Sequence, residues 1–488
     1  MIGAGFSGIA AATCLADQGF EVTIYEKNSS AGGRARKFSK DGFTFDMGPS
    51  WYWMPDVFDK YFARFGKKVA DYYQLERLSP SYRVFFGKED VLDVPSNLDE
   101  FYEMIETLEP GSKSKLDQFL KESEEKYQAG MEDLVYSPGN SAMEFVNKKT
   151  ITGFFKLDLF KSISSYLRKY FSNPKVLQLL EFPILFLGAM PKNTPALYSL
   201  MNYADIVLGT WYPQGGMHQI IAGMVSLAEE KGVKFKFNAS IQEIRLVKDQ
   251  VSSITINGES IETEAIINSA DYHHVEQQLL PKSHRQYDEK YWENRKMAPS
   301  SLLYYIGVDK KLDMLEHHNL FFDTDFNAHA EEIYQNPAWP KNPLFYVCCP
   351  SKSDNSVAPD GKENLFILIP SAPGLIEDKE IKETYFNKVI ERLERLTDQS
   401  IREHIVFHQS YGATNFISDY NAFKGNAYGL ANTLKQTAFL KPSIRNKNIK
   451  NLYNTGQLTV PGPGVPPSLI SGQIAADELM KDFKPHTI

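Results

Sequence analysis

The chain has 488 residues, enough for two domains, and its formal net charge of −8 gives no basic surface for nucleic acid. Its three cysteines predict neither a disulfide framework nor a metal-binding motif, and they fit a reducing, cytoplasmic compartment. No apolar run is as long as a membrane-spanning helix, whereas the aromatic content of 13% is high enough to line a long apolar cavity or, more commonly, to fill a core.

A glycine-rich turn opens the chain. Gly3, Gly5 and Gly8 have the spacing G-x-G-x-x-G, which allows a tight turn, close approach of a pyrophosphate and close helix packing. The Ala- and Leu-rich stretch 9–17 predicts a helix whose N-terminus would attract phosphate. Only two residues precede Gly3, too few for the central strand of such a domain, so we expect the native chain to begin several apolar residues earlier.

The residues after this helix strengthen the nucleotide-binding interpretation. Residues 21–25 (EVTIY) predict a buried strand that ends at Glu26, where a carboxylate can accept hydrogen bonds from ribose hydroxyls. The following AGGRARKF supplies Gly33 and Arg34, which suit a dinucleotide with two phosphates. An acid rather than an arginine after the strand argues against a 2′-phosphate.

The next third of the chain predicts hairpins, helices and an apolar segment. Residues 82–95 predict two short antiparallel strands, and residues 97–135 predict helix. The basic, aromatic stretch 148–171 is either an amphipathic helix at a membrane interface or a surface helix that buries one face. The apolar run 176–190 is too short to span a bilayer, and it would form a tunnel wall or an embedded patch.

Glu181 lies inside this apolar run. Burial would raise the pKa of its carboxyl group and make it a candidate proton acceptor or donor. A carboxylate that reaches solvent or pairs with a nearby lysine or arginine is the simpler expectation. Glu181 is therefore the one candidate catalytic residue that the sequence offers.

Residues 211–275 return to an α/β pattern, with a Gly-Gly turn, an amphipathic helix and then a series of strands. The strands are expected at 233–237, 241–247 and 251–256, and in a buried run that ends before Asp271. The C-terminal segment 448–480 repeats the strand–loop–helix order, and Ser468 is the expected N-cap of its helix. That helix N-terminus could stabilise negative charge on a reduced cofactor ring.

These elements predict an α/β fold in which a Rossmann-like nucleotide-binding domain is discontinuous. We expect residues 1–75, 206–279 and 411–488 to form that domain. We expect residues 76–205 and 280–410 to form an inserted α+β domain that binds substrate and associates with a membrane.

Six motifs together resemble the bacterial-type phytoene desaturases, which are carotenoid oxidoreductases among the amine-oxidase-like flavoproteins. They are GAGFSGIAAA with Glu26, AGGRA, FDMGPS, YPQGGMHQIIAGM, NSAD and NLYNTGQLTVPGPGVPPSLISG. The first two are typical of flavoproteins in general, whereas the YPQGG and C-terminal motifs are much more specific to carotenoid enzymes. The resemblance extends over nearly the whole chain.

The resemblance implies an FAD cofactor, a long apolar channel for a lipophilic polyene substrate, and peripheral attachment to the membrane that holds that substrate. By motif, Gly3, Gly5, Gly8, Gly33 and Arg34 would hold the pyrophosphate, Glu26 the ribose, and Ile241 the adenine side. Asp271 and the loop from Gly456 to Pro466, which includes Val465, would lie near the flavin or its ribityl chain. Val460 stands where relatives often have histidine, so no acid–base role is expected there.

The implied reaction is desaturation, in which a hydride leaves one carbon for flavin N5 and a proton leaves the adjacent carbon. Phytoene converted to lycopene in successive steps is the leading expectation, with oxygen or a membrane quinone as electron acceptor. A carotenoid isomerase without net oxidation, an enzyme acting on another polyene and a non-catalytic flavin-binding protein remain alternatives. An amine oxidase is disfavoured, because neither an aromatic cage nor a cysteine for a covalent flavin is recognisable near the C-terminal loop.

Overall fold

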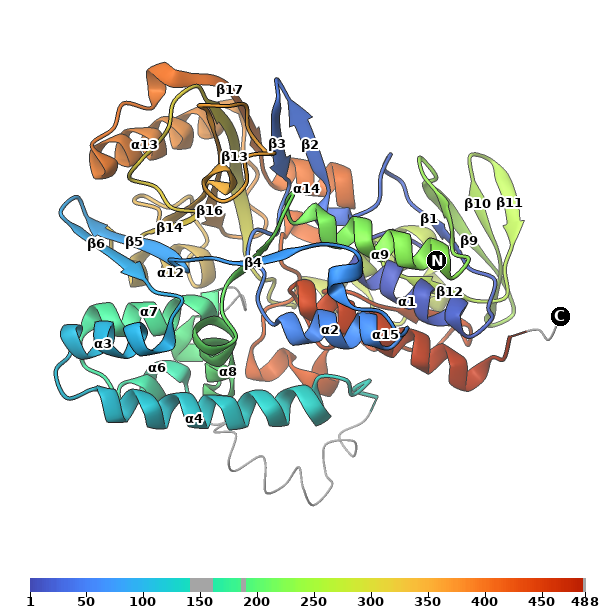
Figure 1. Ribbon diagram of the computed structural model, residues 1–488. Coiled ribbons are helices and arrows are strands. Elements are labelled where there is room, and N and C mark those ends of the chain that lie inside the picture. Colours follow the sequence, from blue (N-terminus) through green and yellow to red (C-terminus); the bar gives the residue numbers. More distant parts are fainter. Residues whose placement is uncertain (141–160, 186–189, 486–488) are drawn as a thin grey trace.

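A parallel sheet joins segments from both ends and the middle of the chain (Figure 1). The computed structural model describes residues 1–140, 161–185 and 190–485. The paired strands are β1 (Thr23–Tyr25) with β8 (Lys234–Lys236), and β12 (Ile266–Asn268) with β18 (Leu452–Asn454). Ile2 forms parallel bridges to both Tyr25 and Asn268, so the first residues occupy the central position between the two pairs. The expected Rossmann-like α/β arrangement is confirmed.

Helix α1 (Phe6–Asp17) follows the glycine-rich turn, as the sequence predicts, and it packs against α9 (His218–Glu230) and α15 (Val465–Asp482). The approach to α15 is very close. A Cβ atom on Gly472 would lie 2.2 Å from the carbonyl oxygen of Ser7. Only glycine therefore allows the first and last helices to cross at this distance.

The start of α15 differs from the expectation. The helix begins at Val465 with Gly464 as its N-cap, so the prediction that Ser468 caps it is wrong. The reason is that Pro466 and Pro467 fit the first turn, where no backbone N–H is needed for an intrahelical hydrogen bond. The helix N-terminus consequently lies within the Pro/Gly loop rather than after it.

Several small antiparallel units surround the parallel sheet. The meander contains β9 (Ile241–Val247), β10 (Gln250–Ile256) and β11 (Glu259–Glu262), and it matches two predicted strands. The two-stranded units are β2 (Lys37–Lys40) with β3 (Phe43–Asp46), and β4 (Leu75–Arg77) with β7 (Trp211–Pro213).

A mixed sheet of seven strands forms the other half of the molecule, in the order β17-β13-β16-β15-β14-β5-β6. The bounds are β5 (Tyr82–Gly87), β6 (Asp90–Val94), β13 (Ser300–Val308), β14 (His318–Phe321), β15 (Phe345–Cys348), β16 (Glu363–Ser371) and β17 (Ile405–Tyr411). Strands β5 and β6 are antiparallel, which confirms the prediction for residues 82–95. The large sheet thus combines strands from both expected inserts; the domain boundaries themselves stay a prediction.

Alternate side chains of this sheet enter two different cores. On β13, Leu302 and Tyr304 pack with helix α13 (Lys379–Thr397), whereas Leu303 and Tyr305 face the main core of the molecule. This two-residue alternation is the signature of a sheet that is covered on both faces.

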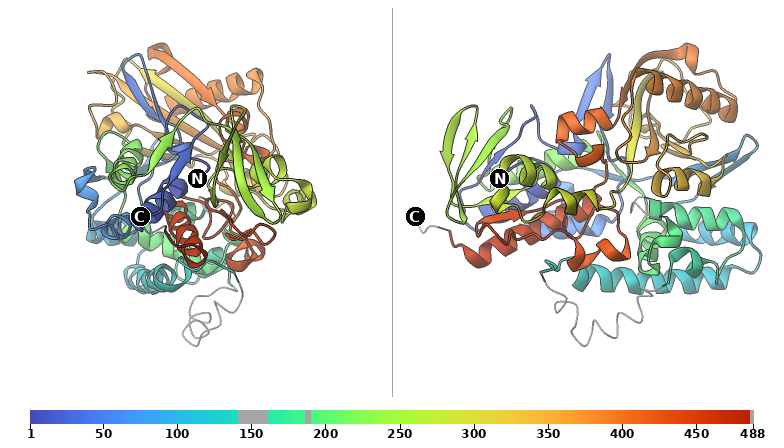
Figure 2. Two further views of the ribbon diagram at one scale, coloured as in Figure 1. Left: turned by 90° about the vertical axis from the view of Figure 1, so that its right-hand side faces the viewer. Right: turned by 180° about the vertical axis from the view of Figure 1, so that it is seen from behind.

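Helices gather at the end of the molecule away from β9–β11 (Figure 2). They include α3 (Leu98–Leu108), α4 (Lys113–Ala129), α6 (Ile163–Leu167), α7 (Pro174–Leu185) and α8 (Leu200–Asn202). The remaining helices are α2 (Pro55–Ala63), α10 (Tyr272–His274), α11 (Glu289–Glu293), α12 (Phe326–Tyr334) and α14 (Ala413–Tyr420). The expected helix over 97–135 is interrupted between α3 and α4.

The basic segment predicted at 148–171 lies partly outside the described residues. Its described part includes α6, which buries Ile163, Tyr166 and Leu167. Among the described helices, none combines the length and apolar character needed to cross a bilayer.

Candidate functional site

A cavity of about 450 Å³ begins at the glycine-rich turn and continues to the large sheet. Ten residues proposed from the sequence line it: Gly3, Gly5, Glu26, Gly33, Arg34, Ile241, Asp271, Gly456, Val465 and Pro466. They come from sequence positions as far apart as residues 3 and 466, so the fold brings together what the motifs suggested separately. Gly8, the remaining residue that the sequence assigns to the cofactor, does not belong to the lining.

The three glycines of the first turn have different surroundings. Gly3 has a φ of +89°, a conformation that a side chain disfavours. A Cβ atom on Gly5 would meet no protein atom within 4 Å, so this position is open to the cavity. A Cβ atom on Gly8 would lie 2.1 Å from the carbonyl oxygen of Gly3, so Gly8 serves packing of α1. Gly5 alone of the three leaves backbone accessible to a ligand without a role in packing.

Glu26 is buried at the end of β1. Its Oε2 accepts a hydrogen bond from the Ala4 amide at 2.8 Å, and its Oε1 accepts one from the Asn28 amide at 2.8 Å. These bonds fix the carboxylate beside the glycine-rich turn. Ile241 lines the same cavity from β9, together with Tyr25 and residues of the β8–β9 connection.

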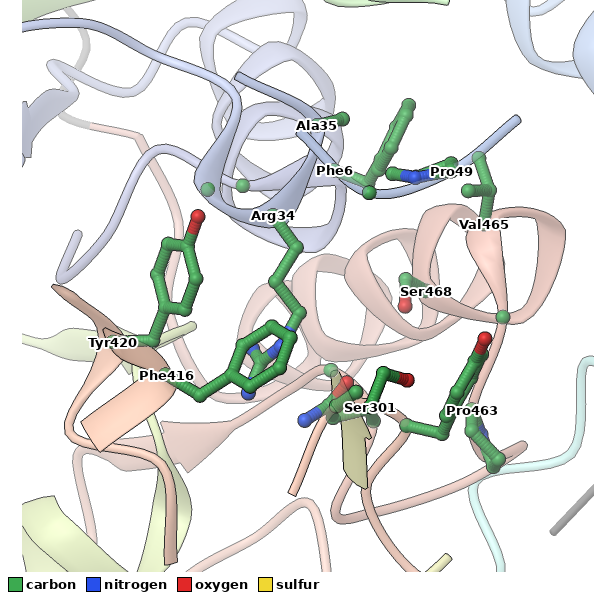
Figure 3. A pocket seen from close by; sticks show the side chains of 18 of the residues that line it. Phe6, Arg34, Ala35, Pro49, Ser301, Phe416, Tyr420, Pro463, Val465 and Ser468 are labelled. Carbon is green, nitrogen blue, oxygen red and sulfur yellow. The ribbon is translucent and has the colours of Figure 1, made fainter. Parts of the chain in front are cut away.

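Arg34 extends along Phe416 and Tyr420, which belong to α14 (Figure 3). Its guanidinium carbon lies 5.0 Å from the centre of the Tyr420 ring, and its Nη2 donates to the carbonyl oxygen of Asn426 at 3.3 Å. The Nε atom is buried, and the part of the chain that the structure describes offers it no hydrogen-bond partner. Burial also lowers the pKa of the guanidinium. A buried cation with an unused donor is suited to an anionic ligand such as a pyrophosphate.

The opposite wall is formed by the N-terminus of α15. Val465 and Ser468 project from it beside Phe6 and Pro49 (Figure 3). The first backbone N–H groups of a helix are unpaired and carry partial positive charge, so this end can stabilise an anion. Asp271 also lines the cavity; its carboxylate accepts hydrogen bonds from the amides of His274 and Phe423, and burial raises its pKa.

The other end of the cavity is apolar. Its walls are Phe182, Met201, Leu320, Phe322, Phe326, Ile333, Leu344, Phe366 and Leu368, from α7, α8, β14, α12 and β16 and the residues next to them. Phe182 lies within the apolar run that was expected to form a tunnel wall. The other wall residues were not individually predictable, because no local motif marks them.

Glu181 has a different position from its neighbour Phe182. It is buried on α7, and its Oε1 accepts a hydrogen bond from Arg168 Nη1 at 2.5 Å. It does not belong to the described lining of the cavity. This arrangement agrees with the simpler expectation of an ion pair.

Sequence reasoning missed a polar group on the large sheet. Tyr346 lines the cavity, and its hydroxyl oxygen lies 2.6 Å from Nδ1 of the buried His318. His317 and Cys348 are their neighbours. The only local signal in the sequence is the adjacent pair His317 and His318 at the start of β14. Tyr346 lies far from this pair in the sequence and reaches it because β14 pairs with β15.

Comparison with known families decides the class of protein. The model of the flavin containing amine oxidoreductases matches residues 6–480. The chain belongs to this family. Four features of the cavity fit the dinucleotide part of a flavin cofactor. They are the glycine turn, the buried carboxylate of Glu26, the unpaired Nε–H donor of Arg34 and the N-terminus of α15. The protein is an FAD-dependent oxidoreductase.

Full-length relatives of this flavin oxidoreductase include named desaturases. A carotenoid 3,4-desaturase from Haloarcula japonica is 42% identical over 484 residues, which cover 99% of this chain and 98% of the relative. A 4,4'-diapophytoene desaturase (4,4'-diaponeurosporene-forming) from Staphylococcus haemolyticus is 32% identical, with 99% of each chain covered.

Solved structures of more distant proteins share the fold. An oxidoreductase from Methanosarcina mazei has a TM-score of 0.63 at 14% identity, covering 98% of this chain and 99% of its own. Cyclohexylamine oxidase from Brevibacterium oxydans has a TM-score of 0.58 at 15% identity, covering 99% and 98%. At these identities the likeness establishes the architecture of this flavin oxidoreductase, not its substrate.

Proposed function

We propose that this flavin oxidoreductase is a carotenoid desaturase, which removes hydrogen from a CH–CH bond of a polyene. The observation that carries the proposal is the 42% identity to a carotenoid 3,4-desaturase over nearly the full length of both chains. The apolar end of the cavity supports it, because a hydrocarbon substrate offers no groups for polar recognition. FAD, when bound, supplies the acceptor for the hydride.

The residues of the chain would divide the work between the two ends of the cavity. Gly3, Gly5, Gly33 and Arg34 would hold the diphosphate, Glu26 the ribose, and Ile241 the adenine side, while Gly8 packs the turn against the sheet. Asp271, Gly456, Val465 and Pro466 would border the flavin, with the α15 N-terminus favouring negative charge there. The aromatic and aliphatic walls would position the polyene and exclude water.

The position of the new double bond is the finer question. Successive desaturation of phytoene to lycopene is the expectation from the sequence motifs. A 3,4-desaturation of an already conjugated carotenoid is the second candidate, and the Haloarcula japonica relative favours it. The two differ in substrate, because one needs phytoene and the other a more desaturated polyene.

Anaerobic reduction of the flavin tests the proposal. The FAD-loaded protein is mixed with liposomes that carry either phytoene or lycopene, and flavin bleaching and pigments are followed. Bleaching with longer polyene bands is the expected result, and the substrate that produces it decides the position of desaturation. An isomer change with oxidised flavin would overturn the proposal in favour of an isomerase, and bleaching by amines alone would indicate an amine oxidase. Reoxidation by oxygen or by a quinone then identifies the electron acceptor.

We also propose that the enzyme is a cytoplasmic protein that binds the membrane surface peripherally, where its substrate dissolves. Phe439 and Leu440 support this, because they are exposed by 44% and 40% and follow the exposed Lys435 closely in the sequence. Replacing both with serine is expected to lower binding to anionic liposomes severalfold. Val406→Ser, at an equally exposed apolar residue of β17, is the control and should bind as the wild type does. Equal liposome binding by all three proteins would reject this surface.

A further inference from the structure

The proposed desaturation releases a proton into a cavity whose walls are mostly apolar. A desaturase removes one hydrogen as hydride and the adjacent hydrogen as a proton, so some group must accept that proton. Among the described residues that line the apolar end, hydroxyl and imidazole groups are the candidates, and Tyr346 is the one whose hydroxyl contacts a buried histidine.

The geometry of the large sheet explains this contact. His318 on β14 is paired directly with Cys348 on β15, and Leu320 is paired with Tyr346. Side chains two residues apart share a face, so Tyr346 lies diagonally opposite His318 on the face that borders the cavity. Trp51 stacks on the His318 ring, with centres 4.0 Å apart and planes 11° apart. Strand pairing and stacking thus hold the imidazole beside the phenol.

Further polar side chains lie beyond His318, and among the described residues the two histidine rings are in contact but not joined by a hydrogen bond. The ring centres of His317 and His318 lie 4.5 Å apart, and His317 Nδ1 is 3.0 Å from the hydroxyl oxygen of Ser353, which is partly exposed. The Nε2 atoms of both histidines are buried and have no hydrogen-bond partner among the described residues. A small cavity of about 20 Å³, wide enough for one water molecule, borders His317 and Cys348.

We propose that Tyr346 and His318 take up the proton that desaturation releases, an inference that rests on the proposed function. The breaking C–H bond leaves its electron pair in the new C=C bond, and its proton goes to Tyr346 Oη. The hydroxyl proton of Tyr346 moves to His318 Nδ1, so the phenol is restored and His318 becomes an imidazolium. FAD, when bound, would accept the hydride that balances the oxidation. The imidazolium of His318 then loses one proton to solvent water, which restores the neutral ring.

The protonation states at rest suit this direction of transfer. Burial raises the pKa of Tyr346 well above its ordinary value, so its hydroxyl stays protonated and donates to His318 Nδ1 when that ring carries its proton on Nε2. Burial, and then the neighbouring His317, lower the pKa of His318, so its ring stays neutral and can accept. A weak base is sufficient, because loss of the hydride leaves positive charge on the polyene and makes the adjacent C–H bond acidic.

The same group could be read as a metal site, since one donor atom from each of His317, His318 and Cys348 lies within 4.8 Å of the others. Burial raises the pKa of the Cys348 thiol to about 12, so this thiol would have to lose its proton to bind a cation. No carboxylate belongs to the trio, so a buried dication would be poorly neutralised there. The geometry therefore favours proton transfer, and metal analysis of the purified protein checks it.

The test uses FAD-loaded protein and three substitutions. Tyr346→Phe removes only the hydroxyl and is expected to slow anaerobic flavin reduction about 100-fold, with unchanged FAD content. His318→Gln keeps a polar side chain and should slow it about tenfold. Tyr304→Phe is the control, because Tyr304 lies on the other face of the sheet and donates to the carbonyl oxygen of Lys382; it should reduce flavin as the wild type does.

Two further readouts separate proton transfer from a structural role. The wild-type rate should be flat between about pH 6 and 8, whereas the His318→Gln rate should rise with pH because Tyr346 must then ionise. The titratable groups around His318 include His317, Tyr346 and Cys348. Asp46 and Tyr212 lie at the small cavity, Asp354 lies beyond His317, and Tyr428 lies near Tyr346. In the apoprotein, ¹⁵N-histidine NMR should show His318 Nδ1 as a hydrogen-bond acceptor whose signal shifts in Tyr346→Phe.

Each outcome has one meaning. A Tyr346→Phe variant that folds and reduces flavin at the wild-type rate overturns the relay and leaves the desaturase proposal standing. A wild-type protein that desaturates no carotenoid overturns the proposed function, even if the NMR shows the hydrogen bond. Stoichiometric metal that is lost in His318→Gln overturns the relay in favour of a metal site. If Tyr346→Phe does not fold, His318→Gln and the NMR experiment decide.

Discussion

The two ends of the cavity are built by different means. At the nucleotide end, the ligand would meet backbone at Gly5 and the N-terminus of α15, and a few fixed side chains such as Glu26 and Arg34. At the hydrocarbon end, the walls are side chains from five separate helices and strands. Backbone geometry needs particular residues at fixed spacing, whereas an apolar wall tolerates many residues of the right volume. The nucleotide end is therefore recognisable from sequence motifs, whereas the hydrocarbon end depends on how side chains pack in the folded chain.

The largest effect is expected at the glycine turn, where one substitution should lower the stability of the protein and another should lower its affinity for FAD. Gly8→Ala would place a Cβ atom 2.1 Å from a backbone oxygen, so it should destabilise the protein by about 3 kcal/mol or more, with or without FAD. Gly5→Ala meets no protein atom within 4 Å, so the apoprotein should unfold as the wild type does. Its FAD affinity should nonetheless fall, by roughly 100-fold.

Thermal unfolding of apoproteins and FAD titration measure these two quantities. Equal loss of stability in both variants would mean that Gly5 also packs the turn. Full FAD affinity in Gly5→Ala would mean that the phosphates do not approach the backbone there.

A substitution at the hydrocarbon end should slow desaturation and leave FAD binding unchanged. Ala330 is a buried lining residue of α12, and Ala330→Phe would fill part of the cavity. Desaturation of a long polyene should fall by about 100-fold, because a misplaced substrate no longer meets the reacting groups, while FAD binding should be unchanged. Ala328→Phe, on the exposed side of the same helix, is the matched control. Loss of FAD from Ala330→Phe would show that the two ends are not separable.

This difference also explains what the sequence could predict. The strand that ends at Glu26 and the helix after Gly8 follow from local patterns, and the structure contains both. The contact between Tyr346 and His318 depends on the register of β14 with β15, which no local pattern specifies. The prediction that Ser468 caps α15 is wrong, because Pro466 and Pro467 fit the first turn of the helix and the helix therefore begins before them.

A buried polar network stands behind the apolar wall and makes the stability depend on pH. Trp53 lines the cavity and donates through Nε1 to Thr210, which donates with Tyr82 to the Asp205 carboxyl group. Burial raises the pKa of Asp205 to about 7. A raised pKa means that the folded state binds the proton more tightly, so this stabilisation is complete below about pH 4 and is lost as the pH rises through 7.

Asp205→Asn cannot ionise and removes this dependence. Relative to the wild type, its free energy of unfolding should increase by roughly 2–4 kcal/mol between pH 4 and pH 8. Melting temperatures across this range measure the effect, with the exposed Asp313→Asn as control. Parallel curves for wild type and Asp205→Asn would show that Asp205 is already ionised in the fold.

The smallest effect is expected at Glu181, next to the wall residue Phe182. Its carboxylate pairs with Arg168, whose side chain is half exposed, so Glu181→Gln should cost about 1 kcal/mol of stability. Glu331→Gln, in a longer pair with Lys192 in which both side chains are half exposed, should cost almost nothing. Because Glu181 lies outside the described lining, flavin reduction should keep its wild-type rate. A stable Glu181→Gln protein with slow flavin reduction would instead make this carboxylate the proton acceptor, and Tyr346 and His318 would then be parts of the wall.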